Sequence, residues 1–120
     1  MKLHSYTFPY RRYRTIDKKS GKEIIYYDPM LPCRFEWKGK KTPIIDGWLD
    51  SGADSIVLPL AIAKYLGLEL QDASPMRVVG GSVERFESIV DLTIGRAGRF
   101  TSFPNVKVSI PKKRTIHLYF

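Results

Sequence analysis

A mainly β domain with one short helix is the fold class that the sequence predicts. Apolar and polar residues alternate along most of the 120-residue chain, which is the period of half-buried strands. Clusters that contain glycine or proline separate these runs, as they do at the turns of antiparallel sheets. The length suits one domain, and 43% apolar residues can form a buried core, so the composition excludes a disordered chain.

The first expected element is a β-hairpin over residues 10–27. Ile24 and Tyr26 lie two residues apart, and a polar run at residues 17–22 predicts the turn between the two strands. Pro29 and Pro32 then interrupt the pattern, because proline lacks a backbone donor and restricts the residue before it. We therefore divide the chain into an N-terminal basic β-hairpin extension, residues 1–30, and a domain over residues 31–120.

Two strands and the single helix are expected next. Cys33, Phe35 and Trp37 alternate, so one strand should bury these side chains on one face. Residues 38–41 predict a turn, and residues 42–49 predict a second strand. The helix is expected at about residues 59–66, with Pro59 in its first turn and Gly67 just past its end. Three leucine and isoleucine residues at four-residue spacing should face the core: Leu58, Ile62 and Leu66.

Further antiparallel strands are expected in the C-terminal half. Residues 76–79 and 83–86 flank Gly80-Gly81-Ser82, which predicts a tight hairpin tip. Residues 88–94 and 99–103 predict a second hairpin, and residues 106–110 alternate again. After a turn at 111–114, residues 115–120 begin a last strand.

The charge of the chain is unevenly distributed. Twenty basic and twelve acidic residues give a formal charge of +8, which raises nucleic acid or an acidic membrane surface as a partner. Residues 1–45 hold 11 basic and 4 acidic residues, residues 46–75 hold 1 and 5, and residues 76–120 hold 8 and 3. We therefore expect acid–base chemistry in the acidic segment between the two basic ones.

The composition also excludes several kinds of site. Cys33 is the single cysteine, so the chain has no intramolecular disulfide, and two histidines add too few ligands for a zinc site. No run of about 18 apolar residues is present, and the first residues lack the apolar stretch of a secretory signal. We expect a cytoplasmic protein without a metal ion, a cofactor or a membrane partner.

One segment combines an apolar strand with groups that can do chemistry. The strand leads directly into Asp50-Ser51-Gly52, which places a carboxylate in a tight turn that backbone amides can approach. The longer run, Trp48-Leu49-Asp50-Ser51-Gly52-Ala53-Asp54, resembles the signature of the retropepsin family, the retroviral-type aspartic peptidases. That signature is two apolar residues, Asp, Thr or Ser, Gly, Ala and a polar residue. The resemblance covers roughly residues 33–120.

The resemblance implies a fold and a mechanism. Members of the family form a closed acid-protease barrel and act as homodimers, so two copies of Asp50 would meet and activate a water against a peptide bond. Ser51 would tie the two active-site turns together across the dimer, and Gly52 would let its backbone lie close to the two carboxylates. Ala53 and Asp54 would contact the peptide or protein substrate.

Family members also carry a flap, a glycine-rich hairpin that follows the aspartate in the sequence. In this chain Val79, Gly80, Gly81 and Ser82 fall in that place. The resemblance implies that this tip binds substrate by closing over an extended peptide and excluding water, as lids do.

The resemblance departs from the family pattern at the C-terminal end. In the family, two apolar residues followed by Gly-Arg or Gly-Asn, a short helix and a strand complete the domain. Residues 116–120 resemble the strand that leads into this motif, and the motif does not follow them. We therefore expect a domain without this element and without the arginine that steadies the aspartate corresponding to Asp54.

Two other functions stay open. A relative without activity would keep the fold as a binding or assembly module. A basic nucleic-acid-binding β domain is the other alternative, because Arg11-Arg12-Tyr13-Arg14 interleaves an aromatic ring with cations. Charged residues on hairpins commonly solvate a face or protect an edge, which favours the peptidase over the nucleic-acid-binding domain.

Overall fold

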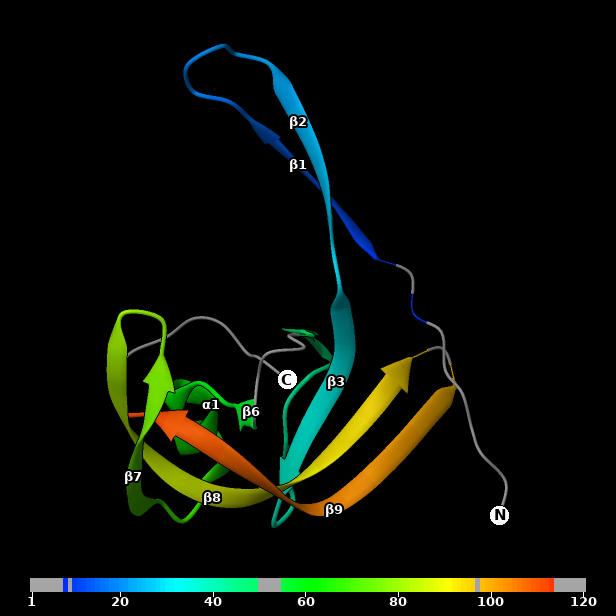
Figure 1. Ribbon diagram of the computed structural model, residues 1–120. Helices are drawn as coiled ribbons and strands as arrows, with labels where there is room; N and C mark the ends of the chain where they lie inside the picture. The colour runs from blue at the N-terminus through cyan, green and yellow to red at the C-terminus, as the bar shows by residue number, and fades with distance from the viewer. Residues whose placement is uncertain (1–7, 9, 50–54, 97, 114–120) are drawn as a thin grey trace, which may run out of the picture.

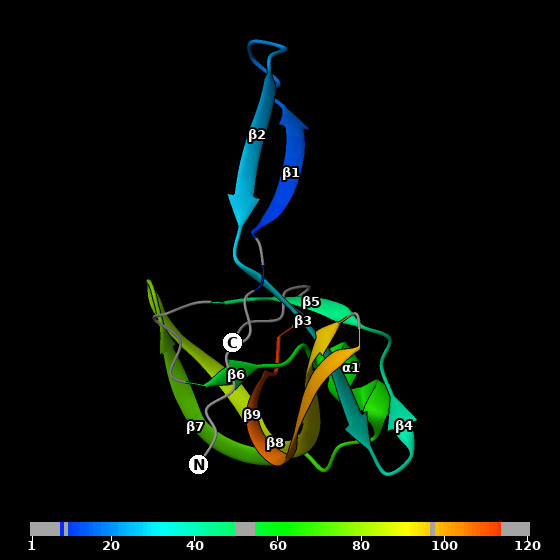
Figure 2. The ribbon, with the colours of Figure 1, turned by 90° about the vertical axis from the view of Figure 1, so that its right-hand side faces the viewer.

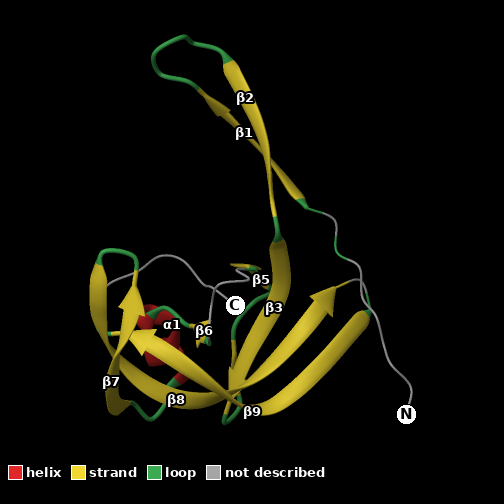
Figure 3. Ribbon diagram, in the orientation of Figure 1, coloured by secondary structure: helices red, strands yellow, loops and turns green. Residues whose placement is uncertain are grey.

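The computed structural model describes residues 8, 10–49, 55–96 and 98–113, which form two antiparallel-rich sheets and one helix (Figure 1). Strands dominate the described residues, as the alternation predicts, and the helix is short (Figure 3). The elements in chain order are β1 Arg11–Ile16, β2 Glu23–Asp28, β3 Met30–Trp37, β4 Lys40–Lys41, β5 Ile45–Trp48, β6 Ile56–Val57, α1 Leu60–Leu66, β7 Gln71–Val78, β8 Gly81–Arg96 and β9 Arg99–Pro111.

The predicted N-terminal hairpin is present as a separate two-stranded sheet. Strands β1 and β2 pair antiparallel from Arg11↔Asp28 to Ile16↔Glu23, and they stand away from the larger sheet in both views (Figures 1 and 2). Asp17 closes the turn, because its carboxylate accepts bonds from the Lys19 amide and the Ser20 hydroxyl. The hairpin continues directly into β3 through Pro29.

The larger sheet has seven strands and does not close. Its order is β4-β3-β8-β9-β6, with β5 paired to β3 and β7 paired to β8. The closed barrel that the family resemblance implied is therefore wrong for the described residues. The physical reason lies at the two ends of the order, where β4 and β6 have only two residues each and pair with β3 and β9 rather than with one another.

The long strands β8 and β9 form the centre of this sheet. Each of them runs without a break through segments that the sequence predicted as separate strands. The pairing of β8 with β9 contains a bulge, where Pro104 and Asn105 lie opposite Asp91. Asn105 has a φ of 53°, a backbone conformation that asparagine tolerates, and its amide donates to Asp91 Oδ1 over 2.9 Å. The carboxylate thus satisfies a backbone donor that the bulge removes from the ladder.

The core lies between the sheet and the helix. Cys33 and Phe35 are fully buried and Trp37 packs against them, which confirms the predicted face of β3. The sequence predicted a strand over residues 42–49, whereas β5 spans only Ile45–Trp48. Among the described residues, the buried hydrophobic core consists of Cys33, Phe35, Leu58, Ala63, Leu66, Leu68, Val90, Leu92, Val108 and Ile110.

Helix α1 ends at Leu66 and is followed by Gly67, as predicted, and it begins at Leu60, one residue later than predicted. The Leu68 amide donates to the Ala63 carbonyl and the Gly67 amide to the Lys64 carbonyl, both over 3.1 Å, so the last turn ends in a left-handed cap. Leu58 and Leu66 are buried, and Ile62 packs partly against the same core. Among the described residues no helix has the length and apolar character needed to cross a membrane.

Candidate active site

Backbone hydrogen bonds hold the chain on both sides of the aspartate motif. Strand β5 pairs with β3, and just beyond it the Leu49 amide donates to the Pro29 carbonyl over 2.9 Å. Strand β6 pairs parallel with β9, and the Leu58 amide donates to the Ser109 carbonyl over 2.8 Å. The predicted catalytic Asp50 lies outside the described residues, as do four other predicted site residues: Ser51, Gly52, Ala53 and Asp54.

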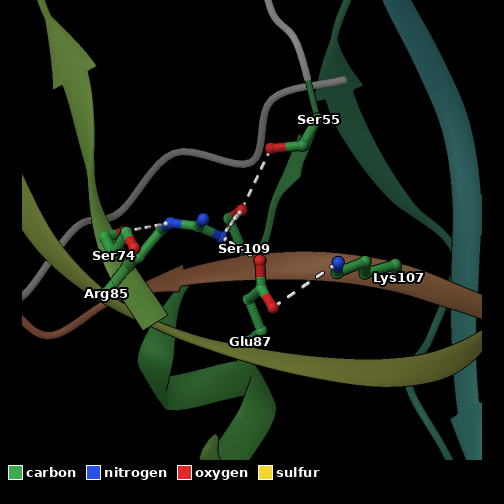
Figure 4. Close-up of polar contacts among 6 residues, drawn as sticks. All are labelled: Ser55, Ser74, Arg85, Glu87, Lys107 and Ser109. Atoms are coloured by element: carbon green, nitrogen blue, oxygen red, sulfur yellow. Dashed lines mark hydrogen bonds and ion pairs between the residues drawn. The ribbon is translucent and has the colours of Figure 1, made fainter. Parts of the chain in front are cut away.

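A cluster of polar side chains lies where the chain resumes after this motif. The Ser55 and Ser109 hydroxyls share a hydrogen bond of 3.0 Å, and Arg85 Nη1 donates to Ser109 Oγ over 2.9 Å (Figure 4). The Ser109 residue is 3% exposed, and the Arg85 side chain is 18% exposed. Arg85 on β8 is therefore connected through the buried Ser109 hydroxyl to Ser55, the residue that follows Asp54 in the sequence.

The same arginine also holds the strand before the predicted flap. Arg85 Nε donates to the Ser74 carbonyl of β7 over 2.8 Å, and Arg85 Nη1 pairs with Glu87 Oε1 over 2.7 Å (Figure 4). Ser74 lies at the bulge of the β7–β8 hairpin, between the pairs Ala73↔Arg85 and Met76↔Val83, so this bond holds the hairpin at its bulge. The hairpin that carries the predicted flap and Ser55, the residue before β6, thus share a single hydrogen-bond network.

Two cations surround the carboxylate of Glu87. Lys107 Nζ lies 3.5 Å from Glu87 Oε2, on the side opposite to the Arg85 contact (Figure 4). The hydrogen bond from Arg85 lowers the pKa of Glu87 below its ordinary value, desolvation opposes this shift, and the charge of Lys107 adds to it. Glu87 is therefore held as a carboxylate, and it serves here as an acceptor rather than as a proton donor.

The predicted flap is an exposed hairpin tip with a tighter turn than the sequence suggested. Val78 pairs with Gly81, so the two-residue turn is Val79-Gly80, one position earlier than the predicted Gly80-Gly81-Ser82 tip. Val79 is fully exposed, and Gly80 has a φ of 87°, which most side chains disfavour. Gly81 and Ser82 begin β8 and are exposed as well. The four predicted flap residues therefore lie together at one solvent-facing tip.

A cavity of about 460 Å³ lies next to the polar cluster, and Glu87 belongs to both. Its volume is within the range of small-ligand sites, about 300–1,000 Å³. Glu69 and Glu87 line it together with Lys38 and Lys107, and both lysine side chains are 70% exposed. Because its lining mixes both signs of charge, the cavity selects no particular ionic ligand.

The remaining candidate groups offer no further chemistry. Burial raises the pKa of the Cys33 thiol to about 12, with a smaller contribution from the charge of Asp46, so the thiol stays protonated and unreactive. Within the described ranges, no three histidine, cysteine, aspartate or glutamate side chains come together in a group that could hold a metal ion.

Sequence reasoning missed Arg85. The signal that could have found it is the spacing of Arg85 and Glu87, two residues apart in an alternating strand, because side chains at that spacing share one face of a sheet. The contacts with Ser74 and Ser109 involve other strands, so the sequence around Arg85 does not indicate them.

Comparisons with known protein families, with curated proteins and with solved structures found no match for this chain.

Proposed function

We propose that this chain is an aspartic endopeptidase that acts as a homodimer, with Asp50 from each copy in the active site. The observation that carries the proposal is the run from Trp48 to Asp54, which fits the aspartic peptidase signature at every position. The described residues add support, because backbone hydrogen bonds fix both ends of the motif and because Val79-Gly80 forms an exposed hairpin tip of the kind a flap requires.

The proposed reaction needs two carboxyl groups that share one proton. Two carboxylates about 3 Å apart do not both ionise in the acidic range, so one remains protonated there and the pair titrates as a unit. The ionised Asp50 takes a proton from a water, whose oxygen adds to the carbon of the scissile peptide bond. The protonated Asp50 of the other copy donates its proton to the carbonyl oxygen. The first Asp50 then gives the proton it took from water to the nitrogen, the C–N bond breaks, and the second Asp50 takes back a hydroxyl proton as the carboxyl product forms.

Cleavage of an unfolded protein substrate tests the proposal. We expect the chain to cut such a substrate between about pH 4 and 7, with products identified by mass spectrometry, because an aspartate pair works in that range. Asp50→Asn removes the titrating carboxyl group and should abolish cleavage. Asp72→Asn is the matched control, since Asp72 is an exposed aspartate whose one ion pair among the described residues is with Lys112, and it should cut like the wild type.

Two results would count against the proposal. Cleavage that persists unchanged in Asp50→Asn would show a contaminating peptidase or another nucleophile. Absence of cleavage by the wild-type chain, at concentrations where sedimentation shows a dimer, would favour a binding or assembly module instead.

A further inference from the structure

We propose that the β1–β2 hairpin is a binding arm for single-stranded nucleic acid, a function separate from the peptidase. The sequence alone favoured a solvated basic surface for this segment. The fold changes that assessment, because the hairpin projects from the larger sheet and the described part of the chain leaves its two faces and its tip uncovered (Figures 1 and 2). Its side chains are therefore available to a partner.

The positive charge of the hairpin is largely unneutralised. Of its three acidic residues, Glu23 pairs with Arg14, Asp17 accepts hydrogen bonds inside the turn, and Asp28 is the last residue of β2. Arg11 is drawn to the larger sheet by Asp46, with Nη1 2.8 Å from Oδ2. Four exposed cations have no ion pair among the described residues: Arg12, Lys18, Lys19 and Lys22.

One face of the hairpin combines Arg12 with an exposed ring. Arg12 lies directly opposite Tyr27 in the β1–β2 register, and paired residues share a face of a sheet. Arg14 lies on that face as well, and Tyr27 is 59% exposed. Cations that contact phosphates, beside an aromatic ring on which a base can stack, are the elements of single-strand recognition.

The other face positions a second aromatic group. Tyr13 and Tyr26 stack across the strands with ring centroids 5.5 Å apart, which stiffens the ribbon. Tyr26 remains 43% exposed. Stacking requires unpaired bases, because the bases of a duplex are covered by their neighbours, so the tyrosines select a single strand over a duplex.

Charge also argues against a second copy as the occupant of this hairpin. Six basic and three acidic residues lie between positions 10 and 29, so two hairpins laid side by side would repel one another. A polyanion has the complementary charge, and its binding releases counterions.

The experiment is binding of a fluorescent, mixed-sequence single-stranded DNA oligonucleotide over a range of salt concentrations. A variant with Arg12→Gln, Lys18→Gln, Lys19→Gln and Lys22→Gln should bind more weakly. The slope of log affinity against log salt should fall by up to about 3, since each phosphate contact on a single strand contributes about 0.7. The control carries Lys64→Gln, Arg77→Gln, Arg99→Gln and Lys113→Gln, which remove the same charge from exposed positions elsewhere, and it should keep most of the affinity.

Tyr27 provides a second readout that is independent of charge. Tyr27→Ala should lower the affinity about tenfold with little change in the salt slope, because it removes one stacked base. Tyr27→Phe keeps the ring and should restore binding. Asp50→Asn should bind like the wild type, which separates this arm from the proposed peptidase.

Three outcomes would overturn the inference. Equal loss in the hairpin variant and the control would show a diffuse electrostatic effect. A duplex of the same length that binds as tightly as the single strand would remove the role of the tyrosines. Unchanged oligonucleotide binding, with a shift from dimer to monomer in the hairpin variant, would assign the hairpin to an interface between copies.

Discussion

At the scale of single residues, Gly95 is the position that tolerates a side chain least. Its φ is 133°, and a Cβ placed there would lie 1.8 Å from the carbonyl oxygen of Arg99. We expect Gly95→Ala to destabilise the chain by about 2–4 kcal/mol, because both backbone strain and a clash with main-chain atoms must be relieved. Gly98→Ala is the control, since Gly98 has a φ of 78° and open space around it, and it should cost only about 1–2 kcal/mol. Urea unfolding measures both, and equal costs would contradict the role of the clash.

The contacts of Arg85 should contribute measurably to the free energy of unfolding. Arg85→Gln removes the bonds to Ser74 and Ser109 and leaves the Glu87 carboxylate with only Lys107 nearby. The arginine is mostly buried, so we expect a loss of about 1–3 kcal/mol in the free energy of unfolding. A double-mutant cycle with Ser109→Ala isolates the bond between them. A coupling energy near zero would show that the two side chains do not interact in solution.

At the scale of elements, the hairpin and the central strands should differ in local stability. Strands β1 and β2 form a two-stranded sheet with mostly exposed residues, whereas β8 pairs along its length with β9 and partly with β3 and β7. An isolated two-stranded ribbon is marginally stable, so its amides should exchange with solvent orders of magnitude faster than those of Val90 or Leu92. Hydrogen exchange followed by NMR or mass spectrometry measures this. Similar protection in both places would mean that something covers the hairpin.

Much of each element was predictable from local pattern. The turn of the β1–β2 hairpin follows from a polar run, and the helix ends follow from Pro59 and Gly67, because these signals act over a few neighbouring residues. The bulge at Asp91 was not predicted, because it depends on a backbone amide fourteen residues further along the chain. The open sheet and the Arg85 network were not predicted for the same reason, since both depend on which strands become neighbours. The predicted aspartate motif remains a prediction from sequence.

At the scale of the whole molecule, the ion pairs make stability depend on pH in a defined direction. The pKa of Glu87 is lowered in the folded chain from an ordinary value of 4.5, chiefly by the hydrogen bond from Arg85. Because the pKa of Glu87 is lower in the folded chain, the ionised carboxylate stabilises the fold fully at pH values above its ordinary pKa. This stabilisation is lost as the pH falls through the pKa of the folded chain. Asp17, whose pKa is lowered mainly by Ser20, acts in the same direction. Lys112, whose pKa is raised mainly by Asp72, keeps its contribution until the alkaline range.

The last prediction follows from that direction. Glu87→Gln should lower the urea midpoint at pH 7, and the gap between this variant and the wild type should narrow as the pH falls below about 4.5. Below that pH the unfolded wild-type chain protonates Glu87 more readily than the folded chain does, because the folded pKa is lowered. Glu36→Gln is the control, since Glu36 has no ion pair among the described residues, and its gap should change less. A Glu87→Gln gap that stays constant down to pH 3 would contradict the charge-assisted bond.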